Sequence, residues 1–380
     1  MARILFILNS LAGGGTERST VILAHELVER GHETHVVCLY DAGPEASSWA
    51  AARGITPTVL ASRTPLGWIK EIRAIIAAER PDVVHTALFQ SDIAGRFAAR
   101  ATHTPVIASI VNTTYDRERL RDPSVSALRL GPSWIGERTT WRMVTQFHSV
   151  SEGCAEHVHR TLRIPRSRIT VVERGRDLAA LGANTAERRA EVRSELGVGD
   201  DEKVAMSLGR LDWQKGHVDL VRAAERLGSS SPWRFLVAGK DGNVGDDLRA
   251  SIAASPAGDR VRLLGESSDV GGLLCAADVF ILPSRYEGTA GVVIEAMAVG
   301  TPILSVDLEG LHGILAHEET ALLYPGRDID ALVAGLRRLE SDDDLRSRLV
   351  SNGRQAFDAG FTTDGYVDGM IELYESVIER

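Results

Sequence analysis

The chain has 380 residues, 44% hydrophobic and 25% charged, an ordinary globular composition that excludes a disordered or fibrous protein. That length exceeds the size at which a single hydrophobic core stops growing, so two domains are expected. The formal net charge of −9 argues against a general nucleic-acid binder, whose surface would be strongly basic.

The distribution of charged and apolar residues indicates the domain organisation and location of the protein. Residues 1–178 carry 22 Lys and Arg against 18 Asp and Glu, whereas residues 179–380 carry 21 against 34, which favours two domains with different partners. The first apolar run, Ile4 to Leu8, is too short for a secretory leader, and no stretch approaches the ~20 apolar residues of a membrane span. Three cysteines are too few for a disulfide framework. The sequence therefore predicts a cytoplasmic protein, or one that rests peripherally on the inner membrane surface.

The first half of the chain alternates short apolar runs with amphipathic stretches. The predicted elements are strands over 3–8, 33–39, 82–85, 106–111 and 169–172, and helices over 16–30 and 68–79. Strands that alternate with helices at this spacing indicate βαβ units around a parallel sheet.

The second half repeats this plan. Its predicted elements are strands over 203–208, 233–238, 261–264, 279–282 and 302–306, and helices over 216–227, 291–299 and 361–378. The pattern predicts an α/β protein with two doubly wound parallel-sheet domains in tandem. We expect an N-terminal domain over residues 1–177, a C-terminal domain over 178–360, and a terminal helix over 361–380 that packs back across the junction.

Open parallel sheets bind ligands at the carboxyl ends of their strands. A first candidate is the glycine run before Thr16, where peptide N–H groups at a helix N-terminus could meet an anion. This run is not the GxGxxG fingerprint of dinucleotide-binding proteins, and a tight turn explains it equally well. The GRLDWQKG loop, which follows the predicted strand at 203–208, is a second candidate. Its Arg210 and Lys215 could converge on one diphosphate, or could be solvated surface cations.

The third candidate is the most informative. It is the run PSRYEGTAGVVIEAMAVGTP over residues 283–302, which places a glycine-rich turn between a strand and a helix. Amides from Gly288 to Gly291 would face a phosphate at the helix N-terminus. Glu287 could accept hydrogen bonds from sugar hydroxyls, and Glu295, eight residues on, from a ribose diol.

These motifs resemble the GT-B glycosyltransferases, specifically glycosyltransferase family 4, over nearly the whole chain. GGGTE resembles the family's N-terminal glycine loop, GRLDWQKG its Arg/Lys pair, and EGTAGVVIEAMAVGTP its E-x7-E motif. The resemblance implies two Rossmann-like domains that face a cleft, with the donor in the C-terminal domain and retention of anomeric configuration by front-face transfer. The implied donor-binding residues are Gly14, Gly15, Arg210, Lys215, Glu287, Gly288, Thr289, Ala290, Gly291 and Glu295. Of these, Arg210, Lys215 and Glu287 are assigned to catalysis.

The sequence departs from the family pattern at three places. Val111-Asn112 stands where relatives often carry a His near the donor sugar's outermost hydroxyl, Arg174-Gly175 replaces an Asn-Gly hinge, and Ala87 stands where some relatives have a second His. An apolar Val111 would leave a sugar 6-hydroxyl unpaired, which costs about 1–3 kcal/mol. We therefore expect a preference for a 6-deoxy sugar or a pentose.

No cofactor is expected, because Arg210 and Lys215 would take the place of a divalent ion beside the departing diphosphate. The pairs and triplets of Asp at 246–247 and 342–344 are interpreted as solvated helix charges rather than a metal motif. The expected substrates are a nucleoside-diphosphate sugar and a hydroxyl acceptor, which could be a small molecule, a glycan or a lipid-linked molecule.

The acceptor side is less defined. The candidate residues are His85, Asn112, Arg142 and His148. Segment Asp116–Arg142 interleaves arginines with Trp134 and Trp141, and three interpretations stay open: a peripheral membrane contact, a pocket for an anionic acceptor, or an ordinary surface. Alternative functions are a GT-B sugar-nucleotide epimerase and a catalytically silent nucleotide-sugar-binding partner. A dinucleotide-dependent oxidoreductase is disfavoured because the first strand lacks GxGxxG.

Overall fold

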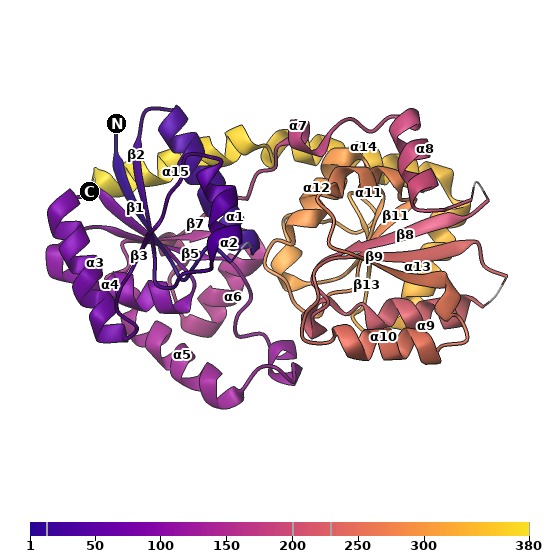
Figure 1. The fold of residues 1–380 in the computed structure, drawn as a ribbon, viewed down its shortest axis with the longest axis horizontal. Coiled ribbons are helices and arrows are strands. Elements are labelled where there is room, and N and C mark those ends of the chain that lie inside the picture. Colours follow the sequence, from indigo (N-terminus) through magenta and orange to yellow (C-terminus); the bar gives the residue numbers. More distant parts are fainter. Residues whose placement is uncertain (13, 200, 229, 380) are drawn as a thin grey trace. The chain divides into compact units, whose positions relative to one another are not determined.

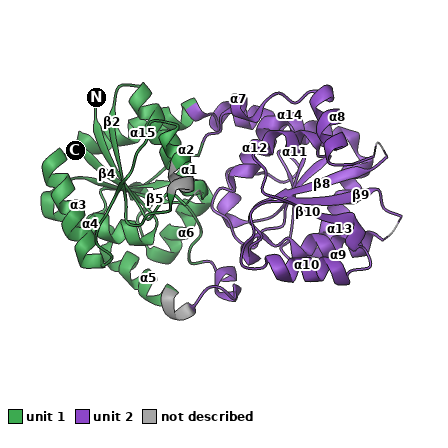
Figure 2. Ribbon diagram, viewed as in Figure 1, with its two compact units in different colours: residues 1–115, 127–174, 364–380 green, residues 116–126, 175–363 purple. Residues whose placement is uncertain are grey.

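The computed structural model describes residues 1–12, 14–199, 201–228 and 230–379. The chain divides into two compact units (Figure 2): unit 1 comprises residues 1–115, 127–174 and 364–380, and unit 2 comprises residues 116–126 and 175–363. The main breaks lie within three residues of the domain edges predicted from the sequence. That prediction, however, left residues 116–126 in the first domain, whereas the structure groups them with the second.

Unit 1 contains a seven-stranded sheet in the order β3-β2-β1-β4-β5-β6-β7, and each neighbouring pair is parallel (Figure 1). Its strands are β1 (Arg3–Leu8), β2 (Glu33–Cys38), β3 (Thr58–Val59), β4 (Val83–Ala87), β5 (Val106–Ile110), β6 (Gln146–Ser149) and β7 (Ile169–Val171). Its helices are α1 (Gly15–Glu29), α2 (Pro44–Ala51), α3 (Pro65–Glu79), α4 (Phe89–Thr102), α5 (Ala127–Thr140), α6 (Glu152–Leu162) and α15 (Thr363–Ile378).

Unit 2 contains a six-stranded parallel sheet in the order β10-β9-β8-β11-β12-β13. Its strands are β8 (Lys203–Leu208), β9 (Trp233–Ala238), β10 (Val261–Gly265), β11 (Val279–Leu282), β12 (Ile303–Val306) and β13 (Leu322–Tyr324). Its helices are α7 (Leu178–Leu181), α8 (Ala186–Glu195), α9 (Val218–Leu227), α10 (Gly245–Ala254), α11 (Val270–Ala276), α12 (Gly291–Val299), α13 (Ile329–Ser341) and α14 (Asp343–Gly360).

Both sheets are covered on both faces, which is why strands such as β1, β8 and β11 are nearly continuous apolar runs rather than alternating ones. In unit 1, side chains of α3, α4 and α6 pack on one face, and those of α1 and α15 pack on the other. In unit 2, α11 and α12 cover one face and α9, α10 and α13 the other. Helix α15 follows unit 2 in the sequence but buries its apolar side chains, Tyr374 among them, in the core of unit 1.

The strand order reverses once in each sheet, between β1 and β4 in unit 1 and between β8 and β11 in unit 2. In doubly wound sheets the ligand crevice lies beyond the carboxyl ends of the strands at such a reversal. The loops that follow β8 and β11 are therefore placed where unit 2 would bind a ligand. No helix within the described residues has both the length and the apolar character needed to cross a bilayer.

Candidate functional site

The loop after β8 is held against the loop after β11 by a glycine. It contains the short 3-10 turn Trp213–Lys215, which ends at Gly216 in the left-handed conformation (φ +68°). A β-carbon on Gly216 would overlap the carbonyl oxygen of Pro283. Both the backbone angle and this close approach require glycine, so Gly216 fixes the spacing between the two loops.

Lys215 joins the two loops electrostatically. Its Nζ lies 2.6 Å from Oε1 of Glu287, and the two side chains are 19% and 7% exposed. The hydroxyl of Ser284 donates to the same carboxylate oxygen at 2.8 Å. An ammonium group has three N–H donors and Glu287 accepts one of them, so Lys215 retains donors for an anionic ligand.

The side chain of Arg285 anchors the loop after β11 to helix α9. Its guanidinium pairs with both carboxylate oxygens of Asp219 at the start of α9, at 2.5 and 3.0 Å, and both side chains are buried. A buried, two-contact ion pair of this kind fixes geometry more than it adds stability. Pro283 to Glu287 are consequently held rigidly over the ends of β8 and β11.

Helix α12 starts at Gly291, as the sequence predicted. Its N-cap residue, Ala290, has a positive φ of 45° and forms no side-chain capping bond, so the left-handed residue of this turn is an alanine rather than one of its glycines. Such a conformation costs about 1–2 kcal/mol and is often found at functional sites. The first-turn N–H groups of a helix have no partner within the helix, which makes this terminus suited to a phosphate.

Glu295 has a partner that the sequence reasoning missed. Its Oε1 accepts from Nε of Arg176 at 2.8 Å, and both side chains are about four-fifths buried. The guanidinium of Arg176 also lies so close to Gly291 that a β-carbon there would overlap it. Arg176 thus adds a cation beside the first turn of α12. The sequence signal for it was its position directly after Arg174-Gly175.

Arg210 lies in the same loop as Lys215 but is more exposed. Its guanidinium pairs with Asp212 at 2.9 Å, and its side chain is 66% exposed. The structure therefore brings Lys215, Glu287, Gly291 and Glu295 to one edge of unit 2, with Arg210 at the solvent side of the loop.

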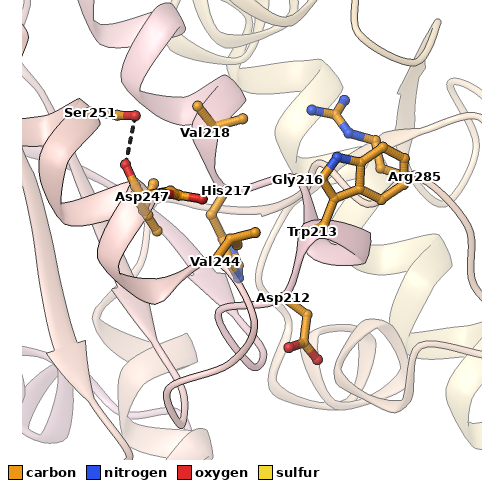
Figure 3. Close-up of a pocket in the computed structure, with 10 residues that line it drawn as sticks. Asp212, Trp213, Gly216, His217, Val218, Val244, Asp247, Ser251 and Arg285 are labelled. Atoms are coloured by element: carbon orange, nitrogen blue, oxygen red, sulfur yellow. Dashed lines mark hydrogen bonds between the residues drawn. The ribbon is translucent and has the colours of Figure 1, made fainter. Parts of the chain in front are cut away.

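A separate pocket of about 180 Å³ lies beside the loop after β8, between the first turns of α9 and α10 (Figure 3). Neither Lys215 nor Glu287 lines it. Its lining residues are Asp212, Trp213, Gly216, His217, Val218, Val244, Asp247, Leu248, Ser251 and Arg285. Its walls are mainly apolar, with the Trp213 indole and Val244 among them.

In unit 1, Gly14 and Gly15 lie between β1 and α1, as predicted. Gly14 is the N-cap of α1 and Gly15 is its first residue. Arg174 donates to the hydroxyl of Thr16 at 3.2 Å, which ties the end of the β7 region to this helix start. Gly13 lies outside the described residues.

Two of the predicted acceptor residues, His85 and His148, are buried in a chain of hydrogen bonds. His85 contacts the Tyr374 hydroxyl and the Ser109 hydroxyl, each at 2.7 Å, and Ser109 contacts His148 at 2.7 Å. His148 then contacts the carbonyl of Val172 at 2.9 Å. The two residues are 5% and 1% exposed, so β4 and β6, on either side of β5, place them inside unit 1 rather than on its surface.

Asn112 and Arg142 lie at opposite edges of the sheet. Asn112 follows β5 at the carboxyl edge, where its buried Oδ1 has no hydrogen-bond partner within the described residues. Arg142 is exposed and stacks on Trp141 just before β6 begins, which places it at the amino edge. The structure therefore does not bring Arg142 together with the other three candidates. Residues 116–126 of the predicted patch belong to unit 2, and α5, with exposed Trp134 and Ile135, belongs to unit 1.

Because three buried histidines have lowered pKa values, we expect the free energy of unfolding to depend on pH. Burial lowers the pKa of His148 to about 4, and burial together with nearby Lys215 lowers the pKa of His217 to about 4. Burial and the neighbouring His148 hold the pKa of His85 well below its ordinary value of 6.5. The unfolded chain therefore binds more protons than the folded chain between pH 6.5 and 4. Consequently the free energy of unfolding should fall as the pH drops through that window.

Urea unfolding at several pH values between about 7 and 4.5 measures how the free energy of unfolding changes with pH. Each histidine contributes a slope of up to about 1.4 kcal/mol per pH unit, so His148→Asn should flatten the dependence by that amount. The exposed residue His103 offers a matched control, and His103→Asn should keep the wild-type slope. An unchanged slope in His148→Asn would contradict the assignment.

No group of three or more His, Cys, Asp or Glu side chains in the described part of the chain is arranged to hold a metal ion. The cationic side chains that the structure places at this edge of unit 2 include Lys215, paired with Glu287, and Arg176, paired with Glu295.

Two family models match the chain. The model of Glycosyltransferase Family 4 matches residues 13–180, and the model of the Glycosyl transferases group 1 matches residues 188–356. Together they span the strand-order reversals of both sheets. The chain belongs to glycosyltransferase family 4 and has the GT-B fold. In this family 4 protein, the loops that carry Lys215 and Glu287 both lie within the group 1 match, residues 188–356.

Individual relatives cover most of the chain. An uncharacterised glycosyltransferase of Methanocaldococcus jannaschii is 25% identical over 94% of this chain and 93% of its own length. UDP-Gal:alpha-D-GlcNAc-diphosphoundecaprenol alpha-1,3-galactosyltransferase of Escherichia coli is 26% identical over 82% of this chain and 81% of its own. The crystal structure of Anabaena HepE in complex with UDP and glucose superposes with a TM-score of 0.84 at 18% identity, over 99% of this chain and 100% of that one.

Proposed function

We propose that this family 4 protein is a retaining glycosyltransferase that transfers a sugar from a nucleoside-diphosphate sugar to a hydroxyl acceptor without a divalent metal ion. The observation that carries the proposal is the contact between Lys215 and Glu287, at 2.6 Å. It places a cation and a carboxylate side by side beyond the strand-order reversal of unit 2, in the loop that leads to the N-terminus of α12.

These groups have distinct parts in the proposed reaction. Lys215, with Arg210 and the amides of Gly288 to Gly291, would bind the diphosphate and stabilise the charge that develops on it as it leaves. Fixed donors aimed at such charge are worth about 3–4 kcal/mol each. Glu287 would accept hydrogen bonds from the donor sugar. Glu295, oriented by Arg176, would accept them from the ribose.

The proposed step is a front-face exchange at the anomeric carbon. The bond from that carbon to the diphosphate oxygen breaks, and a bond to the acceptor hydroxyl oxygen forms on the same face. The acceptor proton passes to the departing phosphate oxygen, which keeps atoms and charge balanced. No protein nucleophile is needed, because the cations and amides of unit 2 carry the leaving-group charge.

The donor class is supported by the relatives. The E. coli relative is a galactosyltransferase with UDP-Gal as its donor, and Anabaena HepE was crystallised with UDP. The E. coli relative acts on a diphosphoundecaprenol acceptor. A lipid-linked acceptor would make the exposed Trp134 and Ile135 of α5 a membrane contact of unit 1.

A donor screen tests the proposal. The chain would be incubated with UDP-, GDP- and ADP-sugars, including 6-deoxy and pentose donors, and release of the nucleoside diphosphate would be measured with and without a chelator. We expect release of one nucleoside diphosphate, undiminished by chelator, with an α-configured product from an α-configured donor. The apolar Val111 favours the 6-deoxy or pentose donors.

Three outcomes would contradict the proposal. Loss of turnover in chelator would refute metal independence. An inverted product would refute retention. A sugar nucleotide converted to its epimer in the absence of any acceptor would identify an epimerase instead.

A further inference from the structure

The loop after β11, residues 283–290, which we call the donor loop, has a further contact that the sequence motifs do not indicate. Arg285 and Glu287 bind residues of the C-terminal half, Asp219 and Lys215. Between them, the hydroxyl of Tyr286 donates to Oδ2 of Asp122 at 3.0 Å. Asp122 belongs to residues 116–126, which we call the strap. It is the stretch of the N-terminal half that groups with unit 2.

The strap is anchored on unit 2 by several contacts. It contains a 3-10 turn, Glu118–Arg121, and Glu118 accepts from Arg327 at 2.7 Å. The guanidinium of Arg327 lies 5.3 Å from the centre of the Trp213 ring, in the loop that carries Lys215. The guanidinium of Arg119 lies 5.9 Å from the centre of the Tyr286 ring. The strap therefore contacts the loop after β11 directly, through Tyr286, and is linked to the loop after β8 through Arg327.

Both carboxylate oxygens of Asp122 accept hydrogen bonds in this arrangement. Its side chain is buried, with 4% of the residue exposed. Oδ1 accepts from the backbone N–H and the hydroxyl of Ser124, at 2.9 and 2.6 Å, and Oδ2 accepts from Tyr286. A buried carboxylate without such donors is costly, so both partners are required.

Tyr286 is fixed at both ends. Its hydroxyl is held by Asp122, and its carbonyl accepts from the side chain of Gln214 at 2.9 Å. Burial and the neighbouring Asp122 raise the pKa of the phenol, so the hydroxyl remains a donor at neutral pH. Glu287 is the next residue along the chain. Its backbone position therefore depends on where Tyr286 is held.

We propose that the hydrogen bond from Tyr286 to Asp122 positions Glu287 for the donor sugar, which makes Asp122 and Tyr286 positioning residues of the transfer reaction. The proposal rests on the donor role of Glu287 given above. The chain enters the strap from Tyr115 and leaves it at Ala127, both in unit 1. The geometry of the donor loop is thus set partly by sequence that lies far from the donor motifs.

Paired substitutions test this. Tyr286→Phe removes only the hydroxyl. Asp122→Asn keeps an oxygen that can accept from Ser124 and replaces the oxygen that accepts from Tyr286 with an NH2 group, which cannot accept. Each should lower kcat about tenfold, and the double variant should lose no more than either single one, because a single hydrogen bond is lost in all three. The Kd values for UDP, GDP and ADP should stay within about twofold of wild type, because Lys215 and the α12 amides remain.

Tyr324→Phe is a matched control. The Tyr324 hydroxyl is buried in unit 2 and has no hydrogen-bond partner within the described residues, so its removal should leave kcat unchanged. Wild-type kcat in Tyr286→Phe, or losses that multiply in the double variant, would overturn the proposal.

A failure of the proposed function can be distinguished from a failure of the proposed positioning role of the strap. If the wild-type chain turns over no nucleotide sugar, the proposed function fails, and amide hydrogen exchange across residues 284–290 then tests the strap alone. Exchange there should be faster in Tyr286→Phe and Asp122→Asn than in Tyr324→Phe. Equal exchange in all three would overturn the positioning role.

Discussion

Replacing Lys215 with Met is expected to lower kcat/KM for nucleotide-sugar turnover by about 10²-fold or more. The side chain lies 2.6 Å from Glu287 and is mostly enclosed, so its charge acts where water screens it poorly. The substitution removes a cation from the leaving group and also leaves Glu287 without its ion-pair partner. Both effects lower the rate, and initial rates at several donor concentrations measure their sum.

Lys203 provides the control for this substitution. It is the first residue of β8, at the opposite end of the strand that leads to Lys215, and its ammonium lies 6.0 Å from the centre of the Trp233 ring. Lys203→Met removes the same charge from unit 2 and should leave kcat/KM near wild type. Circular dichroism should show that both variants are folded. Wild-type rates in folded Lys215→Met and Arg210→Met would remove the diphosphate role from this loop.

A methyl group on Gly310 should reduce kcat/KM by a similar factor, about 10²-fold. Gly310 follows β12, and a β-carbon there would overlap the carbonyl oxygen of Glu287 and lie 3.0 Å from that of Gly288. These are backbone atoms, which cannot swing aside as a long side chain can. Gly310→Ala should therefore displace Glu287 and the start of the α12 turn, and a shift of about 1 Å is enough to cost that much activity.

Gly353→Ala is the matched control for this substitution. Gly353 lies within α14, and the nearest atom to a β-carbon there is Met297 Cγ at an ordinary 3.6 Å. Gly353→Ala should be fully active and more stable by up to about 1 kcal/mol, because alanine favours the helix. Gly310→Ala should also be less stable, by about 1–3 kcal/mol, so rates are compared well below its melting temperature. Full activity in the folded variant would show that Glu287 does not need its present position.

The sequence predicted the framework of the fold closely. The strands at 3–8, 203–208, 233–238 and 279–282 and the helix at 291–299 have the boundaries expected from their apolar runs and flanking glycines. Continuous apolar strands between amphipathic helices leave few arrangements other than a covered parallel sheet. Because ligand sites in such sheets lie at the carboxyl ends of strands, the loops at 209–216 and 283–291 could also be located without coordinates.

Three strands were missed, and their composition explains why. β3 has two residues and β13 has three, too few to show a pattern. β6 reads Gln-Phe-His-Ser, and its polar side chains are buried because Thr170, Ser109 and backbone carbonyls provide hydrogen-bond partners. Those partners come from neighbouring strands. A single sequence contains no sign of them.

The pairings inside the donor site were equally invisible in the sequence. Arg176 and Glu295 are 119 positions apart, and Asp122 and Tyr286 are 164 positions apart. Each motif residue was found from its local turn or helix, whereas its partner depends on which segments the tertiary fold brings together. His85 and His148 show the converse: their strand-end positions suggested an acceptor site, and the fold uses both rings in a buried hydrogen-bond chain.

A crystal structure with the nucleoside diphosphate selected by the donor screen would test the central claim most directly. We predict its terminal phosphate within hydrogen-bond distance of Lys215 Nζ and the amides of Gly288 to Gly291, with its ribose at Glu295. Phosphate density elsewhere on the molecule, with the Lys215–Glu287 pair undisturbed and no ligand beside α12, would contradict it.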